Sequence, residues 1–121
     1  FKVVEMNSPL LTAYFRFLQV ARSLTDAQDT ALSANHRALL EAVVLAWHEG
    51  KPLSVRQAIS LESLGSPATL HKRLATLRSS GLLEEISVEG DRRTKLLGPT
   101  PKALSYFVEL GNAMTQPLAQ A

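Results

Sequence analysis

The stretch from Ser66 to Gly81 constrains the fold most, because it carries both a start signal and a stop signal for a helix. Ser66 can accept a hydrogen bond from a free amide of the first turn, and Pro67 suits the first helical position. Gly81 can take the left-handed conformation that follows a last turn. Three leucines recur at helical spacing, so one narrow stripe of this helix is expected to face a core: Leu70, Leu74 and Leu77.

The opposite side of the same helix combines small, hydroxyl and basic side chains. At about 100° per residue, these side chains are expected on that side or flanking it: Ala68, Thr69, His71, Lys72, Arg73 and Thr76. A helix with such a face can lie in the major groove of DNA, where Lys or Arg reaches phosphates and guanines. An ordinary amphipathic helix with a solvated face explains the same pattern, and this helix alone leaves both interpretations open.

Positive charge is concentrated in one segment of the chain. The net charge of the 121 residues is only +2, but residues 66–95 carry six basic and four acidic side chains, while the rest of the chain is balanced. The length allows one domain with a core. The absence of cysteine excludes disulfide and thiolate chemistry and fits a reducing cytoplasm. No apolar run approaches the ~18 residues of a membrane span, so no membrane association is expected.

The segments before this helix are also expected to be helical. A first helix begins at Ser8–Pro9 and runs to about Leu24, and a second covers about 33–49. A short helix at about 55–61 begins with a capping box, in which Ser54 and Gln57 satisfy each other's backbone groups. A short helix, a four-residue turn with glycine and a longer basic helix form a helix-turn-helix arrangement.

After Gly81 the pattern changes to that of a hairpin. Residues 82–88 are expected to form a strand, 89–91 a turn and 94–97 a returning strand, which Gly98–Pro99 is expected to break. Arg92 and Arg93 would then lie at or just beyond the tip of the hairpin, far from any core. An extended hairpin beside a DNA-reading helix is a wing.

The first and last helices carry more apolar surface than a small core can easily cover. The first helix is expected to bury two sides, either against another subunit or deep in its own core. Thr100–Pro101 begins the last helix, which has a second apolar stripe reaching Met114. We expect the two helices to pair across a dimer axis through side chains of both: Leu11, Phe15, Phe17, Leu18, Phe107 and Leu110.

Two segments resemble a known family when they are taken with this order of elements. Asp91–Leu97 (DRRTKLL), followed by Thr100–Lys102 (TPK), is similar to the wing of the MarR family of winged-helix transcription regulators, with its Asp-x-Arg tip and apolar returning strand. Residues 66–82 resemble that family's recognition helix and its exit. The resemblance covers roughly 33–110 and implies a mainly α fold with a small β-hairpin: a winged helix-turn-helix flanked by N- and C-terminal dimerisation helices.

The resemblance also implies a division of the chain and a DNA-binding surface. Residues 1–32 would supply a dimerisation helix and linker, 33–98 the DNA-binding core and 99–121 a C-terminal helix, all in one compact domain. Arg93 would reach the minor groove with Asp91 orienting it, although a solvated salt bridge at the tip, worth ~0–1 kcal/mol, is the alternative. The expected DNA-binding set is Ser66, Ala68, Thr69, His71, Lys72, Arg73, Thr76, Arg92, Arg93 and Lys95, with Ser54, Arg56 and Gln57 of the supporting helix at the DNA backbone. For Ser54, capping alone is an equally good explanation.

The sequence therefore favours a cytoplasmic homodimer that binds double-stranded operator DNA and regulates transcription, and that a small-molecule effector could release. The alternative is a winged-helix module that binds proteins through its apolar helices without specific DNA binding. Enzymatic activity is not expected, because the chain has neither a glycine-rich phosphate loop nor a nucleophile–base pattern. No metal or other cofactor is expected either, since its three histidines lie on separate segments without a cysteine or paired carboxylate at ligand spacing.

Overall fold

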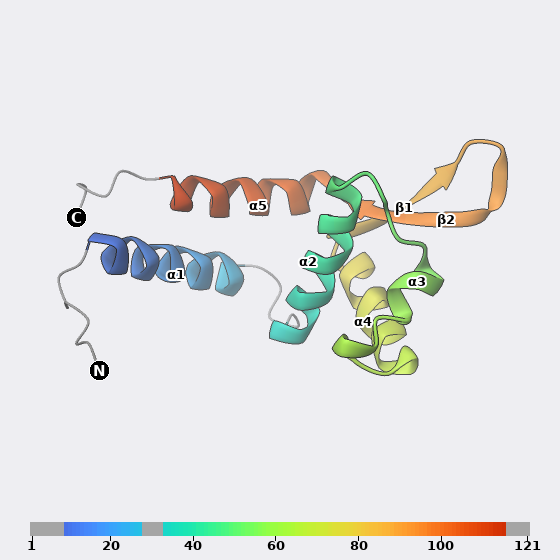
Figure 1. The fold of residues 1–121 in the computed structure, drawn as a ribbon, viewed down its shortest axis with the longest axis horizontal. Coiled ribbons are helices and arrows are strands. Elements are labelled where there is room, and N and C mark those ends of the chain that lie inside the picture. Colours follow the sequence, from blue (N-terminus) through green and yellow to red (C-terminus); the bar gives the residue numbers. More distant parts are fainter. Residues whose placement is uncertain (1–8, 28–32, 116–121) are drawn as a thin grey trace. The chain divides into compact units, whose positions relative to one another are not determined.

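The computed structural model describes residues 9–27 and 33–115, apart from the side chains of residues 25–27 and 92. Its elements in chain order are α1 (Pro9–Ala27), α2 (Ala34–His48), α3 (Val55–Ile59), the 3-10 helix η1 (Glu62–Leu64), α4 (Pro67–Ser79), β1 (Leu83–Val88), β2 (Asp91–Pro99) and α5 (Pro101–Met114) (Figure 1). The expected fold class, mainly α with one small hairpin in a winged helix-turn-helix, is confirmed. None of the helices within these described ranges is long and apolar enough to cross a membrane.

The chain divides into two compact units. The first contains α1 and the part of α5 from Ser105 onward, and the second runs from α2 to Leu104 in the first turns of α5. The boundary between the units therefore falls inside a continuous helix.

Side-chain caps fix where the helices of the second unit begin. Ser54 and Gln57 form the expected capping box of α3: the Gln57 amide donates to Ser54 Oγ at 3.2 Å, and the Ser54 amide donates to Gln57 Oε1 at 2.9 Å. Ser33 and His36 make the equivalent pair at α2, in which the Ser33 amide donates to His36 Nδ1 at 3.1 Å. These local bonds satisfy amides that a helix start leaves without partners.

The helix α4 has the limits that its sequence predicts. Ser66 Oγ accepts the Thr69 amide at 3.3 Å, Pro67 occupies the first turn, and Gly81 has φ +76° just after the helix. The three leucines that were expected to face a core are buried: Leu70, Leu74 and Leu77. They belong to a core that also contains Leu39, Leu40 and Val43 of α2, Ala58 of α3 and Leu82, Leu83 and Leu97 of the hairpin segment.

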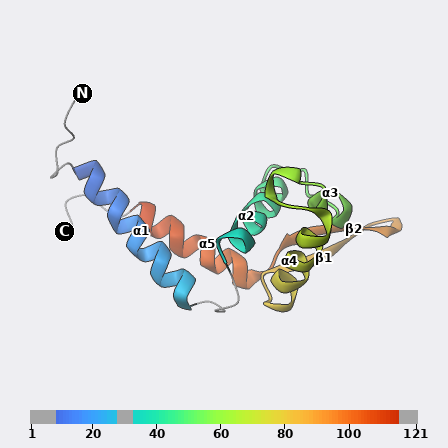
Figure 2. The ribbon, with the colours of Figure 1, turned by 90° about the horizontal axis from the view of Figure 1, so that it is seen from below.

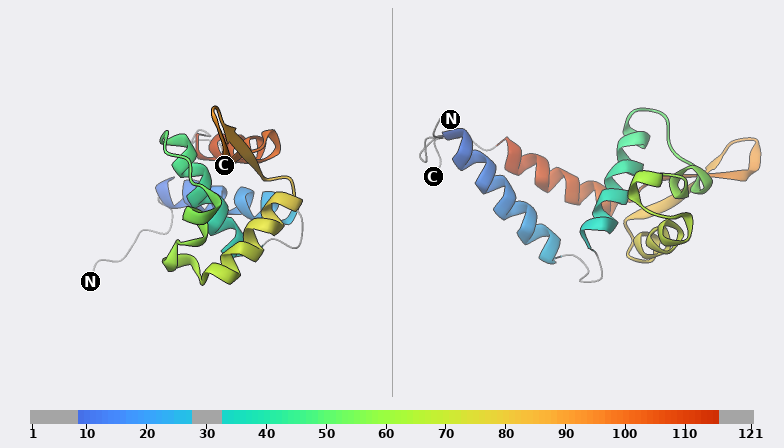
Figure 3. Two further views of the ribbon diagram at one scale, coloured as in Figure 1. Left: turned by 90° about the vertical axis from the view of Figure 1, so that its right-hand side faces the viewer. Right: turned by 60° about the horizontal axis from the view of Figure 1, so that its bottom comes forward.

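The hairpin is an antiparallel pair whose base is attached to the helices. Ser54 makes an isolated bridge to Leu96, and the Leu97 amide donates to the Leu53 carbonyl at 2.8 Å, so the chain before α3 is hydrogen-bonded to β2. Thr100 Oγ1 donates to the Gly81 carbonyl at 2.5 Å and accepts the Ala103 amide at 3.2 Å, which ties the end of α4 to the start of α5. The tip projects away from α2, α3 and α4 (Figure 3).

The expectation that Gly98–Pro99 would break the second strand is wrong. Gly98 pairs with Glu84, and Pro99 pairs with Leu83 as the last residue of β2. The position of Gly98 has no room for a side chain, because Ile86 fills the space: a Cβ there would lie 2.4 Å from Ile86 Cδ1. Pro99 is tolerated because it stands at the end of a two-stranded sheet, where a missing backbone donor costs little.

In the first unit, α1 lies beside the later turns of α5 (Figures 1 and 2). Tyr106 and Ala113 of α5 are buried, and an apolar groove is lined by Ala13, Tyr14 and Phe17 of α1 with Met114 of α5. Much apolar surface of the pair is nevertheless exposed, including 74% of Leu10, 56% of Tyr14 and 52% of Phe15. The residues that were expected at a dimer interface divide into two groups. Phe15 and Leu18 are exposed, and the other four are half-buried: Leu11, Phe17, Phe107 and Leu110.

Candidate nucleic-acid interface

The face of α4 opposite its buried leucines is solvent-exposed. Ala68, His71 and Lys72 lie on it as expected, whereas Thr69 and Thr76 are half-buried at its edge. Both hydroxyls are engaged locally: Ser66 Oγ donates to Thr69 Oγ1 at 2.9 Å, and Thr76 Oγ1 donates to the Lys72 carbonyl at 3.2 Å. Lys72 is the exposed cation at the centre of this face.

Sequence reasoning missed two residues of the same face, Ala75 and Ser79, which are both exposed. The spacing of about 100° per residue that identified Lys72 also places these two opposite the leucines, so the signal was present. Their side chains are small, and small residues allow the helix backbone to come close to a nucleic acid.

Arg73 has a different environment from the one expected. Its guanidinium Nη1 donates to the Leu64 carbonyl at 3.0 Å, and the side chain is half-buried against the turn that contains Gly65. The arginine therefore supports the turn between α3 and α4. Helical spacing places Arg73 next to the buried stripe, which explains this position.

The tip of the hairpin is organised by one carboxylate. Asp91 Oδ1 accepts the backbone amides of Arg93 at 2.9 Å and Thr94 at 3.2 Å, and Oδ2 accepts the Thr94 hydroxyl at 2.6 Å. The Thr94 hydroxyl and, secondarily, these two amides hold the pKa of Asp91 below its ordinary value. The strand register shifts between Ser87 and Val88, and Asp91 pairs with Val88 on the tip side of this irregularity.

Asp91 thus positions Arg93 through the backbone. Among the side chains that the structure describes, no ion pair joins the two residues, and the Arg93 side chain is exposed. The side chain of Arg92 lies outside the described part of the structure. An arginine held by its main chain and open to solvent is available to a partner.

A polar groove brings the start of α3 and the hairpin together. It has a volume of about 380 Å³, and it is lined by Ser54, Val55, Arg56, Glu85, Arg93, Thr94 and Lys95. The Lys95 ammonium donates to Ser87 Oγ at 3.1 Å across the hairpin. Four of the predicted residues therefore share one surface: Ser54, Arg56, Arg93 and Lys95. Gln57 is exposed and serves the α3 cap but does not line the groove.

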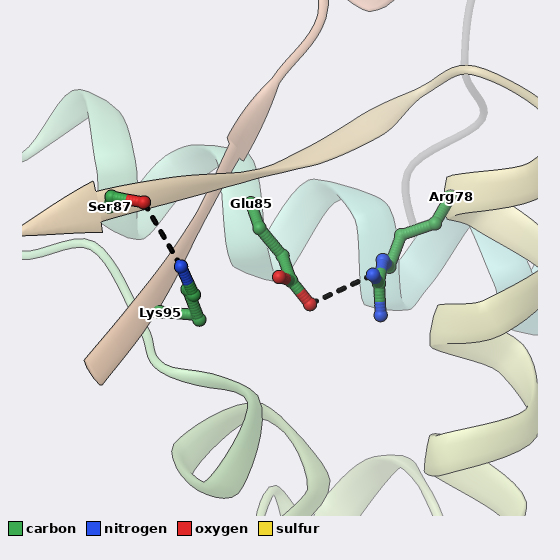
Figure 4. Close-up of polar contacts among 4 residues, drawn as sticks. All are labelled: Arg78, Glu85, Ser87 and Lys95. Atoms are coloured by element: carbon green, nitrogen blue, oxygen red, sulfur yellow. Dashed lines mark hydrogen bonds and ion pairs between the residues drawn. The ribbon is translucent and has the colours of Figure 1, made fainter. Parts of the chain in front are cut away.

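An ion pair that the sequence reasoning did not anticipate links α4 to this groove. Arg78 Nη2 lies 2.8 Å from Glu85 Oε1 (Figure 4). Figure 4 shows the two side chains pointing toward each other between α4 and β1. The two-residue period of β1 places Glu85 on the same strand face as the buried Leu83, which is the signal that could have indicated this contact.

The described ranges contain no group of three His, Cys, Asp or Glu side chains placed to hold a metal ion. His36 lies in the α2 cap, His48 is exposed at the end of that helix, and His71 is exposed on α4. The chemistry of the surface is thus that of cations and hydroxyls around a protruding helix and hairpin.

Comparisons with known proteins identify the fold. No protein-family model matches the sequence, and no curated protein is similar to it at a significant level. Among solved structures, MepR from S. aureus in complex with DNA is similar with a TM-score of 0.59 and 16% identity, over 88% of this chain and 85% of MepR. The apo form of MarR from E. coli matches with a TM-score of 0.54 and 13% identity, over 98% of this chain and 83% of MarR.

FabT from Streptococcus pneumoniae in complex with DNA is similar with a TM-score of 0.53 and 22% identity, over 87% of this chain and 73% of FabT. The agreement spans most of each chain although few residues are identical. The protein therefore has a MarR-like winged-helix fold.

Proposed function

We propose that the protein binds double-stranded operator DNA as a homodimer and thereby regulates transcription in the cytoplasm. One observation carries the proposal: the same compact unit presents the free face of α4, with Lys72 at its centre, and an exposed Arg93 at the tip of a projecting hairpin. A helix for the major groove and a hairpin for the adjacent groove are the two parts of a winged-helix DNA reader. MepR and FabT, which share the fold, were each solved bound to DNA.

The residues of this surface divide by what they can reach. Ala68 and Ala75 let the α4 backbone approach base edges, where Lys72 can contact guanine or a phosphate. Arg93 is assigned to the minor groove. Arg56 and Lys95, which line the groove beside α3, are assigned to the phosphate backbone, where contacts position the protein without reading sequence.

The dimer is proposed because one α4 reads only a few base pairs. Two-fold dimers place two recognition helices about 34–36 Å apart, which is one turn of DNA. The exposed apolar side chains of α1, such as Tyr14 and Phe15, supply a surface that a second copy would cover. A small-molecule effector could then act by changing how the two copies are held.

The same apolar surface favours a second candidate function, a module that binds other proteins through α1 and α5. The salt dependence of binding distinguishes the two functions. DNA binding through Lys72, Arg93 and Lys95 releases counterions, so its affinity should fall steeply as salt rises. Association through apolar side chains should not weaken in this way.

The experiment measures affinity for duplex DNA across a salt series for wild type and for Arg93→Ala. We expect Arg93→Ala to weaken binding and to leave the thermal midpoint unchanged, because the side chain lies outside the core. If Arg93 of each copy in the dimer meets a phosphate, the slope of log K against log salt should become shallower by about 0.9 per copy.

Arg22→Ala is the matched control, because it removes the same charge from an exposed position on α1. The control should retain wild-type affinity. Equal affinities of the two variants would remove Arg93 from the interface, and a flat salt response of the wild type would favour the protein-binding alternative.

A further inference from the structure

A carboxylate stands within the surface that we assign to DNA. Glu85 lies 2.8 Å from Arg78, and their side chains are 30% and 45% exposed. Glu85 is also the one acidic residue among those lining the groove, which it shares with Arg56, Arg93 and Lys95. In a surface built to meet phosphates, a fixed negative charge opposes binding.

The fold does not need this charge. An exposed ion pair contributes little to stability because water screens it. Glu85 pairs with Leu97 through the backbone ladder, which is independent of its side chain, and a glutamine would keep an acceptor for the Arg78 guanidinium. Folding stability therefore gives little reason for a negative charge at this position.

We propose that Glu85 is a specificity-determining residue, an internal substitute for a phosphate that keeps Arg78 occupied on DNA of arbitrary sequence. This inference rests on the proposed DNA-binding function. Binding to arbitrary DNA is almost wholly electrostatic, so withholding one cation weakens it directly. On the operator, the contacts of α4 hold the duplex close enough for a phosphate to displace Glu85 and take Arg78.

The geometry supports an exchange of partners. Arg78 lies in the last turn of α4, and Glu85 lies on the strand that leads to the hairpin tip, so the pair joins the two DNA-reading elements (Figure 4). Both groups face solvent in part, so a phosphate oxygen can approach the guanidinium without unfolding either element. Specificity then comes from a repulsive contact that only the correct complex relieves.

Glu84 provides a matched control on the neighbouring position. It is exposed, and its pairing with Gly98 places it on the opposite face of the strand from Glu85. Glu84→Gln changes the net charge by the same amount as Glu85→Gln but leaves Arg78 paired. A general effect of charge would appear in both variants, and a specific effect only in Glu85→Gln.

The test compares binding of wild type, Glu85→Gln and Glu84→Gln to two probes: a random-sequence duplex and the duplex that the wild type selects from a random pool. We expect Glu85→Gln to bind the random duplex on the order of five- to tenfold more tightly at 0.1 M salt for each copy in the dimer, with a salt slope steeper by about 0.9 per copy, the effect of one further phosphate contact by each. On the selected duplex, the salt slope of Glu85→Gln should equal that of the wild type. Adding Arg78→Gln to Glu85→Gln should restore the wild-type slope on the random duplex.

The outcomes separate the inference from the function on which it rests. If the wild type binds duplex DNA and Glu85→Gln behaves as Glu84→Gln does, the role of Glu85 is refuted and the proposed function stands. If the slope stays steep after Arg78→Gln is added, Arg78 is not the released cation and the inference fails. If neither the wild type nor the variants bind any duplex, the proposed function is wrong and the inference falls with it.

Discussion

Replacing Gly98 by alanine tests how the base of the hairpin is packed. A Cβ at this position would lie 2.4 Å from Ile86 Cδ1 and 3.5 Å from Trp47 Cδ1, whereas carbon atoms in contact prefer about 3.5–4.0 Å. Ile86 must therefore move by about 1 Å or more, and its 38% exposure gives it a way to turn outward. We expect Gly98→Ala to lower the free energy of unfolding by about 1–3 kcal/mol, the usual cost of overpacking.

Urea unfolding followed by circular dichroism measures this change, and Ile86→Ala supplies the matched background. Truncating Ile86 removes the atom that the new Cβ would meet, so Gly98→Ala should cost less than about 0.5 kcal/mol there, the range of substitutions without a special contact. The difference between the two backgrounds is the coupling energy of the pair. An equal cost in both backgrounds, or no cost in either, would refute this description of the hairpin base.

Three further predictions concern the tip, the recognition helix and assembly. Because hydrogen bonds lower the pKa of Asp91 in the folded protein, the stabilisation they give is complete above the ordinary carboxyl pKa of about 3.9 and is lost as the pH falls through the lower folded value. The protection of the Thr94 amide, its exchange rate relative to the intrinsic rate at the same pH, should therefore fall only in that acid window, and Asp91→Asn should lack the acid step. If the Lys72 side chain reads a base, Lys72→Ala should cost on the order of 1–3 kcal/mol of binding free energy and relax the preference at that base. If the side chain meets a phosphate, the substitution should weaken binding to all sequences uniformly and make the salt slope shallower. No effect of either kind would mean that another face of α4 meets DNA. Phe15→Glu should sediment as a monomer and lose operator affinity while it keeps its helical content, because each such side chain buried at an interface is worth ~1.5–3 kcal/mol. A wild type that is monomeric at micromolar concentration and binds a half-site tightly would contradict the dimer.

Local signals predicted most of the second unit because each feature is fixed within a few residues. The start of α4 follows from Ser66 and Pro67, and the start of α3 from the reciprocal bonds of Ser54 and Gln57. The buried side of α4 follows from the spacing of its leucines. In these places the interaction that determines the structure joins neighbours in the sequence, so the sequence displays it.

Local signals do not predict features that depend on contacts between residues distant in the sequence. Gly98 continues β2 by pairing with Glu84, and Ile86 and Trp47 occupy the space of a side chain there; no local rule contains these contacts. Arg73 turns to the Leu64 carbonyl, a bond that depends on how the turn before α4 folds back. The pairing of Arg78 with Glu85 likewise depends on how the hairpin lies beside α4.

Selection of bound sequences from a pool of random duplexes tests most directly whether α4 and the hairpin read DNA as a two-fold dimer. The wild-type protein should enrich a pseudo-palindrome whose half-sites lie about one helical turn apart, 34–36 Å. Recovery of duplexes with no shared sequence, or of none above background, would contradict specific operator binding.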